Sequence, residues 1–178
     1  MESLSNFKEG FLFTSINYLK SKKDKIISLL IIGNTTLFIF SLLHLINGNL
    51  FKGIFELVLS LITFFFTFIL IKRHKIELAA SIGLFVSMLL FTFLFATGGY
   101  EGTGIFWLLA FPIISLTLKS KKCGGVCIIS LFISLFILFV LSKFYLIKIP
   151  YNDKVIILFF CCYTIISTII FFWESIKI

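Results

Sequence analysis

Charged residues and proline are both scarce in this sequence. Only 13% of the 178 residues are charged, whereas an ordinary soluble domain carries roughly a quarter. The chain has 2 prolines, and 60% of its residues are hydrophobic. A water-soluble fold of this size cannot hide so much apolar surface, because small domains keep a large share of their residues exposed. The composition therefore excludes a soluble domain and favours continuous helices in lipid, which satisfy their own backbone polar groups.

The N-terminal residues also lack the hydropathy pattern expected of a cleaved signal peptide. The first apolar run begins near Ile26, too far into the chain, and no small-residue cleavage site follows it. We expect residues 1–25 to form a cytoplasmic segment, either an interfacial amphipathic helix or a frayed polar tail. Four apolar side chains in this segment recur at the spacing of one helical face: Leu4, Phe7, Phe11 and Tyr18.

Six apolar runs approach the roughly 20 residues that span a hydrocarbon core. We expect spans at residues 26–46, 50–71, 78–96, 105–118, 125–142 and 155–173. The fourth is short, and it crosses only if Gly102–Gly104 enter the outer interface or the bilayer thins locally. The predicted fold is all-α, a polytopic bundle of six transmembrane helices over residues 26–173, with a short cytoplasmic C-terminus at 174–178.

The basic residues predict the orientation of this bundle. With six spans, all but four of the 16 lysines and arginines fall on one side of the membrane. The exceptions are Lys52, Lys143, Lys148 and Lys154. Because such residues gather on the cytoplasmic side, we expect both termini to be cytoplasmic, in a multi-pass protein of the inner membrane. The formal charge of +8 fits anionic lipid headgroups as partners, and we expect no nucleic-acid binding.

Glu56 and His44 are ionisable residues inside predicted spans. An ionisable group at that depth costs on the order of 2.5–3.5 kcal/mol, so Glu56 should face protein or water. The Asn47–Asn49 turn joins the two helices, and both side chains lie toward the outer leaflet, so a His–Glu contact is geometrically reasonable. Two readings stay open: interhelical contacts that stabilise packing, or a ligand or proton site.

The stretch from Thr97 to Pro112 is the richest in glycine. Its glycines allow positive backbone dihedrals and a tight turn, with Tyr100 and Glu101 at the outer mouth. Trp107 follows beneath that mouth, and Pro112 should bend the fourth helix. The alternative reading is a plain turn with an interfacial aromatic anchor. Our candidate ligand-binding residues are His44, Glu56, Tyr100, Glu101 and Trp107.

The same stretch resembles a known membrane region. Its motif is carried by Thr97, Gly98, Gly99, Thr103, Gly104, Trp107, Phe111 and Pro112. This pattern is similar to the N-terminal polytopic sensor region of bacterial diguanylate cyclases (GGDEF proteins) and sensor histidine kinases. There, five or six helices precede a cytoplasmic signalling helix and a catalytic domain. No GGDEF motif or phosphoacceptor-histidine helix follows here, so the resemblance implies a sensory or coupling module without its own output.

Residues for metal or covalent chemistry are few. Cys123 and Cys127 lie at a cytoplasmic helix end and Cys161 and Cys162 in mid-membrane, with no histidine nearby, so we read all four as packing residues. Paired carboxylates, a zinc box and a nucleophile elbow are all missing. We therefore expect no enzyme activity, no metal and no cofactor.

Two functional hypotheses follow from the sequence. The first is a membrane sensor or signal-coupling module that binds a small ligand or lipid at an outer-leaflet site. It would act through a partner, either a cytoplasmic or membrane signalling protein or a second copy of itself. The second is a small proton-coupled transporter or channel that uses Glu56 and His44, although the inner half of its path would have only hydroxyls and Asn34.

Overall fold

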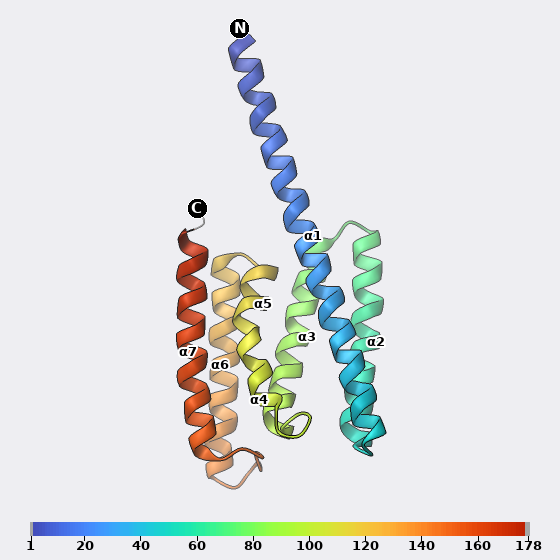
Figure 1. Ribbon diagram of the computed structural model, residues 1–178, viewed down its shortest axis with the longest axis vertical. Coiled ribbons are helices and arrows are strands. Elements are labelled where there is room, and N and C mark those ends of the chain that lie inside the picture. The colour runs from blue at the N-terminus through green and yellow to red at the C-terminus, as the bar shows by residue number, and fades with distance from the viewer. Residues whose placement is uncertain (1, 177–178) are drawn as a thin grey trace.

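The computed structural model describes residues 2–176, with side chains described from Lys23 onward, and over this range it is helical without strands. Figure 1 shows the helices lying roughly parallel or antiparallel in one bundle. Their bounds are α1 Glu2–Ile46, α2 Leu50–Lys72, α3 Ile76–Thr97, α4 Gly104–Trp107, the 3₁₀ helix η1 Leu108–Ala110, α5 Phe111–Leu118, α6 Lys121–Lys143 and α7 Asp153–Ile176. The helical face predicted from Leu4, Phe7, Phe11 and Tyr18 lies outside the residues whose side chains are described, so it stays a prediction.

Five of the described helices are long and apolar enough to cross a membrane, namely α2, α3, α6, α7 and the 23–46 part of α1. Each begins and ends within a few residues of a predicted span. The short connections at residues 47–49 and 73–75 place successive helices antiparallel. The start of the first span and the end of α7 therefore lie at one end of the bundle (Figure 1). We call this the basic end, and the opposite end, with residues 47–49, 98–103 and 144–152, the loop end.

The fourth predicted span is not one continuous helix. Residues 104–118 form α4, η1 and α5, and Pro112 stands in the first turn of α5. Because proline has no N–H, it cannot donate to the carbonyl of Leu108, and the chain passes through a 3₁₀ turn immediately before it. The broken segment still runs from the loop end to the basic end beside α3 and α6 (Figure 1). Alone it is shorter than the other five.

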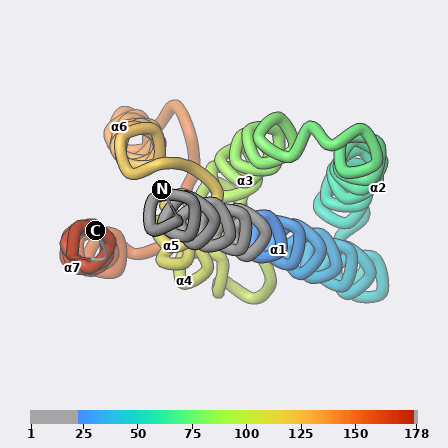
Figure 2. The backbone as a smooth tube through the Cα atoms, turned by 90° about the horizontal axis from the view of Figure 1, so that it is seen from above, coloured from blue at the N-terminus to red at the C-terminus, as the bar shows by residue number. Residues whose placement is uncertain are grey.

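The aromatic core lies on one side of the bundle, between α3, α5, α6 and α7. Phe95 is fully buried, and its ring centroid lies 6.1 Å from that of Phe159. Phe159 in turn lies 5.7 Å from Tyr163, whose hydroxyl donates to the carbonyl of Ile128 across to α6. These contacts fix α6 and α7 against α3, and α1 and α2 lie together on the other side of α3 (Figure 2).

Candidate functional site

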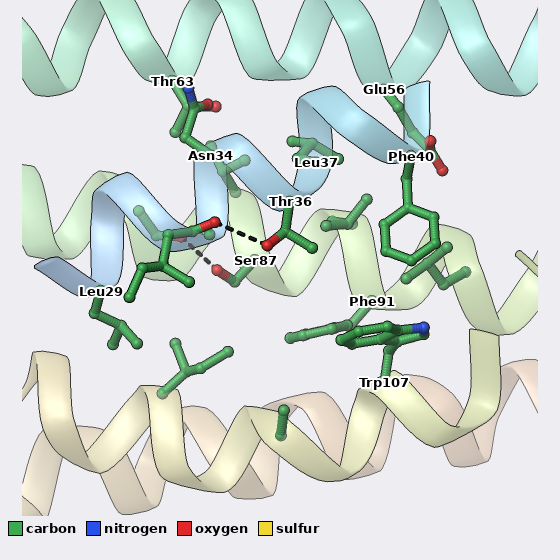
Figure 3. Close-up of a pocket in the computed structure, with 18 of the residues that line it drawn as sticks. Leu29, Asn34, Thr36, Leu37, Phe40, Glu56, Thr63, Ser87, Phe91 and Trp107 are labelled. Carbon is green, nitrogen blue, oxygen red and sulfur yellow. Dashed lines mark hydrogen bonds between the residues drawn. The ribbon is translucent and has the colours of Figure 1, made fainter. Parts of the chain in front are cut away.

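A cavity of about 360 Å³ lies between the α1–α2 pair and the segment formed by α3, α4 and α5. It extends along α1 from Leu29 to His44, roughly 22 Å at about 1.5 Å per residue. Most of its lining side chains are apolar, and Figure 3 shows them converging from all of these elements. Ligand pockets in proteins are usually concave, largely apolar and supplied with a few polar groups. This cavity has that form.

His44 and Glu56 lie together at the loop end of the cavity. Nδ1 of His44 is 2.9 Å from Oε2 of Glu56, and each side chain is only 1% exposed. The turn at residues 47–49 makes this contact, because the amide of Asn49 donates to the carbonyl of His44 and begins α2 beside α1. The contact expected from the sequence is therefore present. The other ring nitrogen of His44, Nε2, is buried and has no hydrogen-bond partner among the described residues.

The other polar side chains between α1 and α2 pair with each other or with backbone. The hydroxyl of Ser60 lies 3.3 Å from Oδ1 of Asn34, and Ser41 donates to the carbonyl of Phe38. Lys52 does not bond to Glu56 one turn later, although their spacing allows a pair. Its ammonium instead donates to the carbonyl oxygens of Thr97, at 2.8 Å, and Gly99, at 3.3 Å. Lys52 thus holds the end of α3 against α2.

The side chains of Tyr100 and Glu101 lie in different surroundings in the structure. Tyr100 lines the cavity, with its ring centroid 5.8 Å from that of His44, and its hydroxyl accepts a hydrogen bond from Asn47 at 3.2 Å. Glu101 is exposed, has a positive φ of 49°, and lies outside the cavity lining. Four of the five candidate residues are therefore gathered at one cavity, and Glu101 is not with them.

The glycine motif closes α3 onto α4. Gly98 ends α3 in the left-handed conformation with φ +85°, which glycine adopts without steric cost. The amide of Gly104 then donates to the carbonyl of Gly98 at 3.0 Å. A Cβ on Gly104 would lie 2.9 Å from the carbonyl oxygens of both Gly98 and Leu94. Thr103 supports the turn by donating its hydroxyl to the carbonyl of Tyr100. The motif therefore allows the end of α3 and the start of α4 to pack with their backbones in direct contact.

The aromatic residues of the motif divide between the cavity and the core. Trp107 lines the cavity and meets Phe40 of α1 edge to face, with ring centroids 5.3 Å apart. Phe111 is fully buried against Phe91 of α3, at 5.7 Å. Ser115 is also buried and donates to the carbonyl of Gly124 in α6. Trp107 is thus the motif residue that bridges the cavity to α1.

The loop between α6 and α7 contributes contacts that sequence reasoning did not anticipate. Pro150 packs so closely on the glycine turn that a Cβ on Gly98 would lie 2.8 Å from its Cγ. Tyr151 donates its hydroxyl to the carbonyl of Leu94 at 3.2 Å. Burial raises the pKa of Tyr151 to about 12, against a smaller lowering by a hydrogen bond with the Ile105 backbone. Its hydroxyl therefore keeps its proton, and the bond, at neutral pH.

Sequence reasoning also missed much of the cavity wall. Phe40, Gly33 and Ser87 line it but belong to no motif, and only the packing of α1 against α3 and α4 brings them together. No group of three or more His, Cys, Asp or Glu residues that could hold a metal ion occurs in the described part of the chain. Cys123, Cys127, Cys161 and Cys162 are free thiols.

Comparison with known proteins identifies a family for nearly the whole chain. A search of curated proteins and a search of solved structures each gave no match. The family model MASE6 matches residues 11–177, which include every span, the His44–Glu56 pair and the glycine motif. MASE6 is a family of membrane-associated sensor domains. A membrane helical bundle with an apolar cavity fits that description, and the chain belongs to the MASE6 family.

Proposed function

We propose that this protein is a membrane sensory or signal-coupling module that binds a small ligand or lipid in the cavity and has no catalysis of its own. The observation that carries the proposal is the cavity itself, which is apolar along its length and has the buried His44–Glu56 pair at one end. Membership of a sensor-domain family supports the same function. In this proposal the loop end faces outward across the inner membrane, so that the pair lies in the outer leaflet.

The moving part in this proposal is the broken segment α4–η1–α5. A ligand can change the conformation only if it binds two arrangements of the helices with different affinity. Trp107 on α4 meets Phe40 on α1 across the cavity, so a ligand that enters between them separates α4 from α1. The 3₁₀ turn at Leu108–Ala110 is the natural hinge, because a 3₁₀ stretch within a helix is a common site of bending.

The signal leaves the membrane at the basic end in this proposal. α5 and α7 both end there (Figure 1), and Trp173 near the end of α7 is 64% exposed. Its exposed indole offers a contact for a signalling protein or for a second copy of the chain. Lipids are the remaining partner, because large apolar side chains of α2 such as Phe64, Phe65 and Phe68 are exposed on the outside of the bundle.

A chimera that joins residues 1–178 to a diguanylate cyclase output domain tests the sensor function. We expect Trp107→Ala to change cyclic-di-GMP output in membranes by about fivefold or more, the lower range of known allosteric couplings. Phe106→Ala is the matched control, because Phe106 is the neighbouring aromatic, is 68% exposed and does not line the cavity. Equal output from wild type and both variants, at equal membrane insertion, contradicts the proposal.

A proton-coupled transporter or channel is the second candidate, and the buried His44–Glu56 pair is the observation that favours it. Such a protein needs a polar path, but the rest of the cavity has only the hydroxyls of Thr36, Thr63, Ser87 and Tyr100, the amide of Asn34 and the indole N–H of Trp107. Proton flux into liposomes that carry the purified protein tests it. Flux that Glu56→Gln abolishes establishes this function in place of the sensor.

A further inference from the structure

The middle of the cavity presents hydrocarbon to an occupant rather than free hydroxyls. Thr36 and Ser87 each donate a hydroxyl proton to a carbonyl oxygen one turn earlier in their own helix, at 2.9 Å and 2.8 Å, and Thr63 does the same. Each hydroxyl has one proton, so none of the three can donate to an occupant without breaking its helical bond. An occupant of this part of the cavity is therefore held by apolar contacts.

The cavity is open on its flank, between α1 and the α4–α5 segment. His44 and Glu56 close the loop end, since each side chain is only 1% exposed. On the flank, by contrast, two lining side chains are also on the outer surface of the bundle: Ile32 is 62% exposed and Ile113 52%. Gly33 lies in the same wall, and a Cβ added to it would meet no atom within 4 Å. A hydrocarbon chain can therefore enter sideways from the bilayer.

Lys25 lies on the same face of α1 as this opening. Lys25, Leu29, Ile32 and Thr36 follow one another at spacings of four, three and four residues, which place them on one helical face. The last three line the cavity, and Lys25 is exposed at the basic end, one turn before Leu29. A lipid with its head at Lys25 can therefore lay a chain against Leu29 and Ile32 and into the cavity.

The other charges at the basic end leave Lys25 as the cation for a headgroup on this face. Lys119 donates to the carbonyl of Glu77 and lies 3.8 Å from its carboxylate, so its charge is largely balanced. Lys121 bonds to a hydroxyl of α7. Asp24 is exposed next to Lys25, but it projects about 100° away around the helix. An anionic head at Lys25 therefore meets a positive charge.

The loop end has the opposite charge beside the same flank. The turn at residues 98–103, which leads into α4, carries the exposed acid Glu101. Lys52 is bound to the carbonyl oxygens at the end of α3. The remaining lysines of this end belong to α6, α7 and their connection, which contribute no described residue to the cavity wall: Lys143, Lys148 and Lys154. An anionic head is therefore favoured at the basic end.

The length of a lipid chain matches the half of the cavity nearest the basic end. A hydrocarbon core of roughly 30 Å gives each leaflet about 15 Å, which is about ten residues of helix. A chain that starts at the level of Ile26 therefore reaches the level of Leu37. Leu30 and Leu37 line this half of the cavity, and both are buried from the outside of the bundle. The volume of about 360 Å³ is near the small end of the usual range, roughly 300–1,000 Å³, and suits one chain.

We infer that the cavity takes one acyl chain of an anionic phospholipid from the leaflet at the basic end. The head lies at Lys25, and the chain runs along Leu29 and Ile32 and enters between α1 and the α4–α5 segment. In the proposed orientation this is the cytoplasmic leaflet, where anionic lipids are found. The inference rests on the proposed function of the cavity as the sensor's ligand site. It adds the class of the ligand, its leaflet and its route of entry.

Photo-crosslinking of the full chain in phosphatidylcholine vesicles tests this inference. The two probes are phosphatidylglycerol and phosphatidylcholine, each added in trace amount with the same diazirine at the end of one acyl chain. We expect crosslinks at Leu30 and Leu37, mapped by mass spectrometry, about fivefold more abundant with phosphatidylglycerol, because one lysine at a membrane surface favours an anionic head by about that factor.

Two pairs of variants separate the head site from the opening. Lys25→Gln should make the two probes equal, whereas Lys122→Gln, an exposed lysine of α6 at the same end, should keep the preference. Gly33→Leu should abolish the crosslinks at Leu30 and Leu37 with both probes, because its side chain narrows the opening. Thr35→Leu, which is exposed on α1 and does not line the cavity, should crosslink as wild type does.

The inference is overturned by equal yields from the two probes in wild type, by unchanged yields in Gly33→Leu, or by an equal effect of Lys25→Gln and Lys122→Gln. Crosslinks confined to exposed residues such as Phe64 would also overturn it, since they report lipid around the bundle.

The diguanylate cyclase chimera distinguishes failure of this inference from failure of the proposed function. Crosslinks at Leu37, with the same output in vesicles with and without phosphatidylglycerol, keep the ligand class and contradict the sensor. Output that Trp107→Ala changes, with no crosslink at Leu30 or Leu37 in wild type, keeps the sensor and contradicts the ligand class.

Discussion

At the scale of single residues, the contact between His44 and Glu56 joins α1 to α2 and leaves one buried ring nitrogen of His44 without a partner among the described residues. Each side chain satisfies one polar atom of the other, at 2.9 Å, inside a helix pair that lipid surrounds. Nε2 of His44 is left over. A contact made only to join α1 to α2 has no need of that second nitrogen, since Asn34 and Ser60 join the same helices with smaller groups. In the proposed function, this unpartnered nitrogen is the feature that favours a ligand site over a packing contact.

Glu56→Ala should lower the free energy of unfolding in micelles by about 1–2 kcal/mol, the usual range for a polar contact between membrane helices. The reason is that Nδ1 of the buried His44 loses its partner. Titration with a denaturing detergent, followed by circular dichroism, measures the change. Val58→Ala is the control, because Val58 is on the same helix and 48% exposed. An equal loss in both variants would show that the pair adds nothing to stability.

At the scale of elements, α5 and α6 pack at unusually close range. The buried hydroxyl of Ser115 donates to the carbonyl of Gly124 at 2.8 Å, which requires the two backbones to approach. Small residues at a helix interface allow this approach in membranes, where packing rather than the hydrophobic effect holds helices together. The contact secures the α5 end of the broken segment against α6.

Gly124→Ala should lower the free energy of unfolding by about 1–3 kcal/mol, the usual penalty for overpacking. Its Cβ would lie 3.0 Å from the carbonyl oxygen of Ser115 and 3.2 Å from Cα of Leu116. Gly125→Ala is the control, because its nearest neighbour is a ring atom of Phe171 at an ordinary 3.5 Å. The same detergent titration compares the two. A larger loss for Gly125→Ala than for Gly124→Ala would contradict this packing.

At the scale of the whole molecule, the arrangement of the helices predicts which loops lie on each side of the membrane. The turns at residues 47–49, 98–103 and 144–152 share one end of the bundle, and residues 73–75 and 119–120 share the other (Figure 1). The second group carries more of the basic residues. We therefore expect the α4–η1–α5 segment to cross the bilayer as a sixth, interrupted span.

Single cysteines in a cysteine-free background test this topology in intact cells. We expect a membrane-impermeant maleimide to label cysteines at Asn47, Glu101 and Tyr145 from outside. Cysteines at Arg73 and Ser120 should react only after the cells are permeabilised, because the basic ends of spans face the cytoplasm. Labelling of the Ser120 position from outside, together with that of Glu101, would show that residues 104–118 re-enter rather than cross.

The sequence by itself determined the helices of this protein and the positions of its polar residues on them. Five spans were predicted within a few residues of their bounds, because hydropathy and helix ends are properties of consecutive residues. The contact between His44 and Glu56 was predictable for the same reason: the three-residue turn between their helices leaves little choice of partner. The motif at Thr97–Gly104 likewise predicted a tight turn, because positive φ angles are a local property of glycine.

Only the tertiary structure decided which helices enclose the cavity and what each polar group meets. Lys52 bonds to carbonyls at the end of α3 rather than to Glu56, Glu101 lies away from the site, and Pro150 covers Gly98. These contacts join residues that are distant in sequence, and in lipid one apolar helix face resembles another. Shape complementarity between side chains, rather than hydropathy, therefore selects the neighbours. The cavity results from that selection, at the place where α1 and α2 do not pack fully against α3, α4 and α5.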